Sequence, residues 1–115
     1  HMLFAQGNFV KLAENFSERL IHVHCKDIRK EVLDESLKND STFRQAFLDG
    51  AFTVPGDGCI DYVPFLKVLK NKNYIGWLVV EAEQDPAKAN PFKYAKIGYN
   101  YLSTTAKKCG FDIIN

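Results

Sequence analysis

The sequence predicts an α/β fold, in which helices alternate with strands that run parallel to one another. Two apolar runs rich in β-branched residues, near 21–26 and 76–82, have the composition of strands. Helical spacing of apolar residues precedes, separates and follows these runs, at 9–19, 62–71 and 91–108. Because a helix between two strands forms a crossover, this order predicts that the strands are parallel neighbours in one sheet.

The first helix is predicted to begin at Asn8, a residue type that caps helix N-termini. Its apolar positions recur at helical spacing and form one face: Phe9, Leu12, Ala13, Phe16 and Leu20. The strand "IHVHC" follows at once, with β-branched residues at alternate positions. Cys25 lies on the same face of this strand as Ile21 and Val23, the face expected to pack against the helices. We therefore interpret Cys25 as a small buried hydrophobic residue.

The segment between the strands is predicted to be helical and then to turn. Residues 29–50 are polar and helix-prone, with Ser41 as a plausible cap and Gly50 as a stop. The stretch "VPGDGCID" (54–61) has turn composition, and Asp61 can cap the next helix. Its glycines are also compatible with a phosphate cradle, although a turn is the more common reading. Pro64 suits the first turn of the helix at 62–71.

The second strand is the most strongly predicted element. "WLVVEAE" opens with a continuous apolar run, which suits a strand buried on both sides in a parallel sheet. Asn90 followed by Pro91 predicts the start of the last helix, and Gly110 follows its end. Two strands do not cover their own edges. We therefore expect residues 1–115 to be the C-terminal part of a larger domain, and the isolated chain to self-associate.

Composition argues against several classes of protein. The chain has 115 residues, 46% of them hydrophobic and 25% charged, with a net charge of +1, and no basic stripe that would indicate a nucleic-acid partner. No apolar run approaches the roughly 20 residues that span a bilayer, so no membrane partner is expected. Three scattered cysteines, Cys25, Cys59 and Cys109, are typical of free thiols in a reducing cytoplasm.

Alternation along the strands brings polar side chains to one face of the sheet. His22, His24 and Lys26 share a face of the first strand, and so do four residues of the second: Trp77, Val79, Glu81 and Glu83. His24 and Glu81 are then expected to meet at the carboxyl ends of the strands, where α/β barrels place active sites. An imidazole with a carboxylate suits Mn, Co, Fe, Ni or Zn. The alternatives are a hydrogen-bonded core histidine and a glutamate that marks where the strand meets solvent.

Three long segments carry a resemblance to a known family. "HVHCKDIR", "VPGDGCIDYVPFLKVLK" and "YIGWLVVEAEQDPAKANPFKYAKIGYNYL" resemble, in this order, the last third of the myo-inosose-2 dehydratases, a family of xylose isomerase-like TIM barrels. The resemblance implies that the chain is a C-terminal fragment of a (β/α)8 barrel, comprising strands 7 and 8 with their flanking helices. It also implies that residues 1–115 belong to a single domain.

The resemblance implies a lyase activity, the removal of water from 2-keto-myo-inositol (inosose) in inositol catabolism. The substrate is then a cyclic polyol ketone, and the cofactor Mn²⁺ or Co²⁺, with glutathione reported for the family. By the family motifs, the metal ligands are His24 and Glu81. The alternatives are a sugar-ketone isomerase or epimerase of the same superfamily, and a non-catalytic polyol-binding fragment.

The resemblance places further residues at the strand mouth. Lys26 is the candidate catalytic acid or base, with a histidine from the part of the enzyme outside this sequence as the alternative. Lys26, Asp27 and Arg29 are candidate substrate contacts. His1 is either a native substrate-binding histidine or, with Met2, a tag residue, and both interpretations stay open. The other two metal ligands of the family lie on strands outside this sequence. The fragment alone is therefore expected to be inactive and to bind metal weakly.

Overall fold

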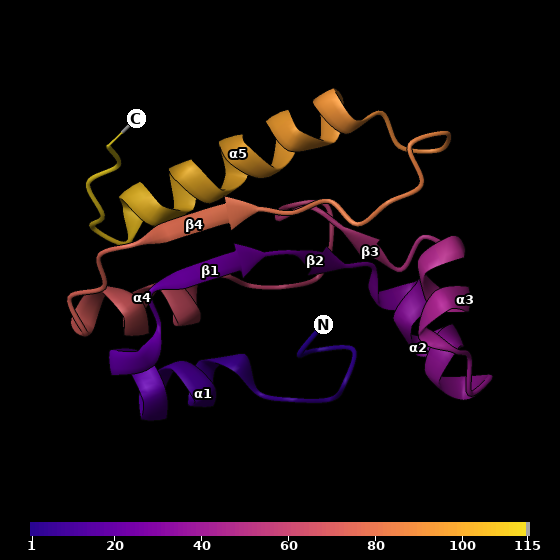
Figure 1. The fold of residues 1–115 in the computed structure, drawn as a ribbon, viewed down its shortest axis with the longest axis horizontal. Coiled ribbons are helices and arrows are strands. Elements are labelled where there is room, and N and C mark those ends of the chain that lie inside the picture. The colour runs from indigo at the N-terminus through magenta and orange to yellow at the C-terminus, as the bar shows by residue number, and fades with distance from the viewer. Residues whose placement is uncertain (115) are drawn as a thin grey trace.

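A computed structural model describes residues 1–114 of the protein. Its centre is a sheet of two parallel strands, β1 (His22–Cys25) and β4 (Trp77–Val80), which lie side by side in Figure 1. The register pairs His22 with Trp77 and Cys25 with Val80. The predicted strands and their parallel pairing are confirmed.

Three helices accompany this sheet: α1 (Phe9–Phe16), α4 (Val63–Asn71) and α5 (Pro91–Lys108). The Asn8 side chain accepts the Lys11 N–H at 2.9 Å, and Asn90 accepts the Lys93 N–H at 3.0 Å, so both predicted caps are confirmed. Residues 17–19, predicted as the end of the first helix, form a separate 3₁₀ turn, η1 (Ser17–Arg19).

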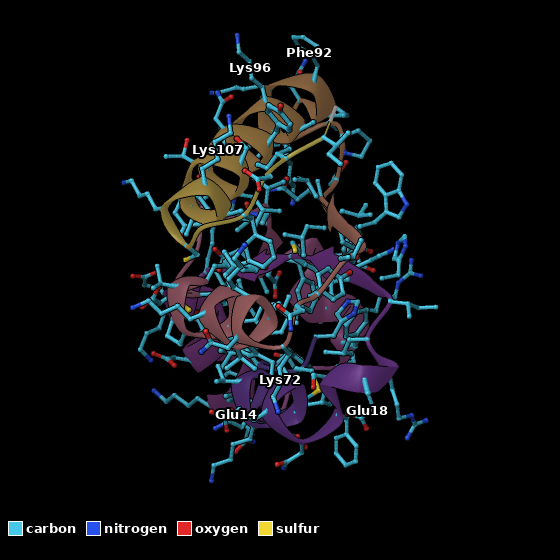
Figure 2. The ribbon with its side chains drawn as sticks, turned by 90° about the vertical axis from the view of Figure 1, so that its left-hand side faces the viewer. Glu14, Glu18, Lys72, Phe92, Lys96 and Lys107 are labelled. Atoms are coloured by element: carbon cyan, nitrogen blue, oxygen red, sulfur yellow. The ribbon has the colours of Figure 1, made fainter. Side chains whose placement is uncertain are left out.

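The main core lies between the inner face of the sheet and these three helices. From the strands, Cys25 belongs to this core and is fully buried, as predicted. Leu78 and Val80 of β4 are partly buried and pack against the core. The helices contribute Ala13, Phe65, Leu66, Leu69, Leu102 and Ala106. Charged residues take the outer faces of the helices, as Glu14 of α1 and Lys96 and Lys107 of α5 show in Figure 2. The amphipathic pattern that predicts the helices therefore also sets which way they face.

A second, smaller unit extends from the carboxyl end of β1. It comprises β2 (Asp27–Ile28), α2 (Lys30–Lys38), α3 (Phe43–Leu48) and β3 (Phe52–Thr53), with β2 and β3 antiparallel. Its own small core contains Ile28, Leu33, Ala46, Ala51 and Phe52. The sequence does not predict this ladder, whereas it does predict helical structure in 29–50 with a cap inside the segment.

One predicted cap in this unit is wrong. Thr42, not Ser41, is the N-cap of α3, because its hydroxyl accepts the Gln45 N–H at 3.2 Å. Gly50 does follow the helix, with a φ of +82° that glycine adopts without strain.

Residues 54–61 form the predicted turn. Gly56 has a φ of +88° and lies so close to Tyr101 of α5 that a side chain at this position would overlap the ring. The Asp61 carboxylate accepts the Val63 N–H at 2.9 Å at the start of α4. Across residues 1–114, none of the helices is both long and apolar enough to traverse a bilayer.

Candidate functional site

The outer face of the sheet carries the predicted pair of polar residues. Glu81 follows β4 directly, and its N–H donates to the Cys25 carbonyl at 3.0 Å, which extends the ladder by one residue. The Glu81 side chain therefore emerges beside that of His24, and His24 Nδ1 lies 3.0 Å from Glu81 Oε2. The structure brings the two side chains together, and their role as metal ligands stays a prediction.

Lys26 lies at the centre of the polar cluster. Its side chain is only 5% exposed, and its Nζ is 3.1 Å from Glu81 Oε1 and in direct contact with Glu83 Oε2. Nζ also lies 2.9 Å from His1 Nε2 and above the Phe52 ring, 5.6 Å from its centroid. A buried ammonium held by two carboxylates has a fixed position, as an acid or base must have.

His1 completes the cluster from the other end of the chain. Its Nε2 is 2.7 Å from Glu83 Oε2, and its ring packs against Phe43 and Phe52 with centroid distances of 5.4 and 5.3 Å. Burial, followed by the charge of Lys26, lowers the pKa of the His1 α-amino group. His1 therefore lies beside the candidate catalytic residue.

Asp27 points away from this cluster. The residue is 1% exposed, and its carboxylate accepts the N–H groups of Ile28 at 2.8 Å, Gly56 at 3.2 Å and Ile60 at 2.9 Å. Burial raises the pKa of this carboxyl group, while the backbone N–H donors act in the opposite direction.

Arg29 is also bound to protein groups. Its Nη1 donates to the Gly50 carbonyl at 2.6 Å, and its Nη2 donates to Thr53 Oγ1 at 3.1 Å and Asp57 Oδ2 at 2.7 Å. The contacts of Asp27 and Arg29 with substrate, predicted from the family motif, remain untested.

A cavity of about 280 Å³ opens beside the His24–Glu81 pair. Its polar side includes Lys26, and its apolar side is formed by Phe9 and Leu12 of α1 and Phe65 of α4. This volume is close to the lower end of the range for small-molecule sites, about 300–1,000 Å³. The cavity is thus lined by His24, Lys26 and Glu81 on one side and by residues of the main core on the other.

The donor set fits part of a metal site. An imidazole and a carboxylate in contact are the ligand types that suit Mn²⁺ or Co²⁺. Within residues 1–114, no three or more His, Cys, Asp or Glu side chains gather as a metal-binding group. The described residues thus offer His24 and Glu81 as two donors, with Lys26 against the second of them.

Two members of the cluster were not assigned by the sequence. Glu83 contacts both Lys26 and His1, and its parity with Glu81 is the signal that could have identified it. The Tyr62 hydroxyl donates to the Lys26 carbonyl at 2.7 Å, and no pattern in the sequence indicates this bond.

The chain is similar in sequence to several known proteins. It is 45% identical to an inosose dehydratase of Clostridium beijerinckii over 96% of its own length and 36% of the relative. It is 47% identical to the rhizopine catabolism protein MocC of Rhizobium meliloti, over 96% of the chain and 34% of that protein. An inosose dehydratase of Geobacillus kaustophilus is 46% identical, over 89% of the chain and 33% of that protein. The chain thus spans about a third of the length of these curated relatives.

The resemblance to inosose dehydratases drawn from the sequence motifs is therefore confirmed. The family model described as xylose isomerase-like TIM barrel matches residues 1–105, which include both parallel strands and most of α5. The chain belongs to the xylose isomerase-like TIM barrel family.

Proposed function

We propose that this chain forms part of the active site of a divalent-metal-dependent dehydratase that removes water from 2-keto-myo-inositol in inositol catabolism. The observation that carries the proposal is the 45% identity to an inosose dehydratase across 96% of the chain. The polar cluster at the carboxyl ends of β1 and β4 supports it, because barrels of this kind hold their active sites at that end of the strands.

In this proposal β1 and β4 are strands 7 and 8 of the barrel. Their parallel pairing supports this placement, as does the crossover between them in the chain, which includes α4. His22 and Trp77 then face the barrel interior, on the side of the sheet opposite the helices.

His24 and Glu81 are the residues that would hold Mn²⁺ or Co²⁺. When bound, such an ion polarises a carbonyl oxygen as a Lewis acid and thereby makes the adjacent C–H more acidic. The 3.0 Å contact between His24 Nδ1 and Glu81 Oε2 supports this assignment, because two ligands of one ion have to lie close together.

Lys26 is the proposed proton carrier. Dehydration beside a ketone breaks a C–H bond and a C–O bond, forms a carbon–carbon double bond and releases water. The C–H proton passes to a general base, and the leaving hydroxyl takes a proton from a general acid. The Lys26 ammonium carries such a proton beside the cavity. The Glu81 and Glu83 carboxylates hold this ammonium in place, and His1 Nε2 lies 2.9 Å from Lys26 Nζ.

The test is an assay of the intact protein with 2-keto-myo-inositol in the presence of Mn²⁺ or Co²⁺. We expect formation of the trihydroxycyclohexane-dione and loss of this activity in His24→Ala. His22→Ala is the control for loss of a histidine from the same face of β1: its ring lies 5.2 Å from that of His24, but Glu81 hydrogen-bonds to His24 and not to His22. Wild-type protein that binds the ion and leaves inosose unchanged would contradict the proposal.

A second candidate is a sugar-ketone isomerase or epimerase. One observation favours it: the family model that matches residues 1–105 is described as xylose isomerase-like. An isomerase needs proton transfer beside a carbonyl as well, so the same residues would serve it. Assaying ketohexose epimerisation in parallel with inosose dehydration separates the two candidates.

A further inference from the structure

The segment that follows β1 is bound to the turn at 54–60 by two charged side chains. Asp27 accepts backbone N–H groups from both ends of the turn, at Gly56 and Ile60. Gly58 lies between them, where a Cβ would overlap the Asp27 carboxylate and come within 2.6 Å of the Ile28 carbonyl oxygen. The fit of carboxylate to turn therefore depends on the glycine.

Arg29 binds the same turn from the neighbouring side. Asp57 Oδ2 accepts one N–H of the guanidinium at 2.7 Å and the Thr53 hydroxyl at 2.7 Å. Thr53 Oγ1 in turn accepts from Gln84 Nε2 at 3.2 Å, beyond the end of β4. Arg29 thus links the turn, β3 and the segment after β4 in one hydrogen-bonded network.

Lys26 lies directly before these two anchors. Its carbonyl accepts the Tyr62 hydroxyl, and the Ile28 carbonyl accepts the Cys59 N–H at 2.9 Å. The backbone on either side of Asp27 is therefore held by the 54–62 segment, and the direction of the Lys26 side chain follows from it.

We propose that Asp27 and Arg29 are positioning residues, which anchor the 54–60 turn and thereby fix Lys26 in the polar cluster, rather than substrate contacts. The anchoring stands on the contacts alone, whereas its effect on catalysis rests on the proposed function.

The first arm of the test does not depend on activity. Amide hydrogen exchange of the intact protein is compared between wild type, Asp27→Asn, Asp57→Asn and the control Asp34→Asn. Asp34 pairs with Lys30 at 2.7 Å, the same distance as the Arg29–Asp57 pair, but on the exposed surface of α2. We expect about tenfold faster exchange across residues 54–60 in Asp27→Asn and Asp57→Asn, and wild-type exchange in Asp34→Asn.

The second arm separates positioning from substrate contact by kinetics. Arg29→Ala and Asp57→Asn should each lower kcat by a similar factor, about tenfold, with little change in KM, and the double variant should lose no more than either one. Asp57 has a side chain 32% exposed, so its variant folds even where Asp27→Asn does not.

Two results would overturn the proposal. One is wild-type exchange of the 54–60 amides in both Asp27→Asn and Asp57→Asn. The other is an Arg29→Ala variant with a raised KM beside an Asp57→Asn variant with wild-type kinetics. If the intact protein does not dehydrate inosose at all, the proposed function fails while the exchange arm still decides the anchoring.

Discussion

Glu81 donates its backbone N–H to the carbonyl of Cys25, 3.0 Å away. This bond aligns the end of β1 with the residue that follows β4. His24 precedes Cys25 and points to the opposite face, which is also the face of the Glu81 side chain. The ladder of a parallel sheet thus fixes the spacing between an imidazole and a carboxylate that lie 57 residues apart in the chain.

Removing either member of this pair tests its proposed role as a ligand. In the intact protein, His24→Ala and Glu81→Gln should each lower Mn²⁺ affinity by about 100-fold or more, because loss of a ligand exceeds the 10–100-fold effect of its outer partners. The measurement is metal content after dialysis, by mass spectrometry. Wild-type metal content in both variants would contradict the assignment, and His22→Ala controls for loss of a histidine from the same strand.

Lys26→Met tests the proton carrier while keeping most of the side-chain volume. We expect kcat to fall by a factor on the order of 10² to 10⁴, the range of a general acid or base. Lys30→Met is the control, because the Lys30 side chain is 64% exposed and pairs with Asp34 of the same helix. Equal activity of the two variants would exclude Lys26 from catalysis.

The buried Cys25 thiol should make the free energy of unfolding depend on pH in the alkaline range. Burial raises the pKa of its thiol from 9.0 to about 12. Between these values the unfolded chain releases the proton and the folded chain keeps it, so the free energy of unfolding falls as pH rises. The slope approaches about 1.4 kcal/mol per pH unit within this window. Urea titrations of wild type and Cys25→Ala from pH 8 to 11 measure it, and an equal slope in both would show that other groups are responsible.

Gly98 tests how closely α5 packs on the sheet. A Cβ here would lie 2.5 Å from Val80 Cγ1 and 3.0 Å from Val54 Cβ. Helix propensity favours alanine by about 1 kcal/mol, but overpacking typically costs about 1–3 kcal/mol. We therefore expect Gly98→Ala to lower the urea midpoint. Asn100→Ala, on the exposed face of the same helix, should leave the midpoint unchanged or raise it. A more stable Gly98→Ala would show that the helix can shift.

The exposed apolar side chains predict self-association of the 115-residue chain. Trp77 is 72% exposed on the outer face of β4, and Ile75 just before it is 94% exposed. We expect light scattering to show dimers or larger species, and Trp77→Glu to shift them toward monomer. Phe92→Glu is the control, since Phe92 is 81% exposed at the far end of α5 (Figure 2). A wild-type chain that stays monomeric at all concentrations would refute this expectation.

The sequence predicts the elements whose apolar residues are periodic. The two parallel strands and the helices capped by Asn8 and Asn90 follow from alternation, helical spacing and cap chemistry. The meeting of His24 and Glu81 also follows, because parity and parallel pairing together determine it.

Other features leave no such trace in the sequence. A ladder of two residues, such as β2 with β3, is too short to show a period of two. The bonds of Asp27 and Arg29 are mostly with backbone groups, which every residue carries, so side-chain patterns cannot reveal them. Ser41 and its neighbour Thr42 are both residue types that cap helices, so the sequence alone does not show that Thr42 is the cap.

The parallel pairing of β1 with β4 also constrains how the chain folds. His24 and Glu81 approach only after the 57 residues between them have closed into a loop, and this closure costs on the order of 4 kcal/mol of chain entropy before any contact repays it. Local elements such as α5 form quickly, whereas pairing between distant strands is slow. We therefore expect the polar cluster to be among the last parts of the chain to assemble, together with the central sheet.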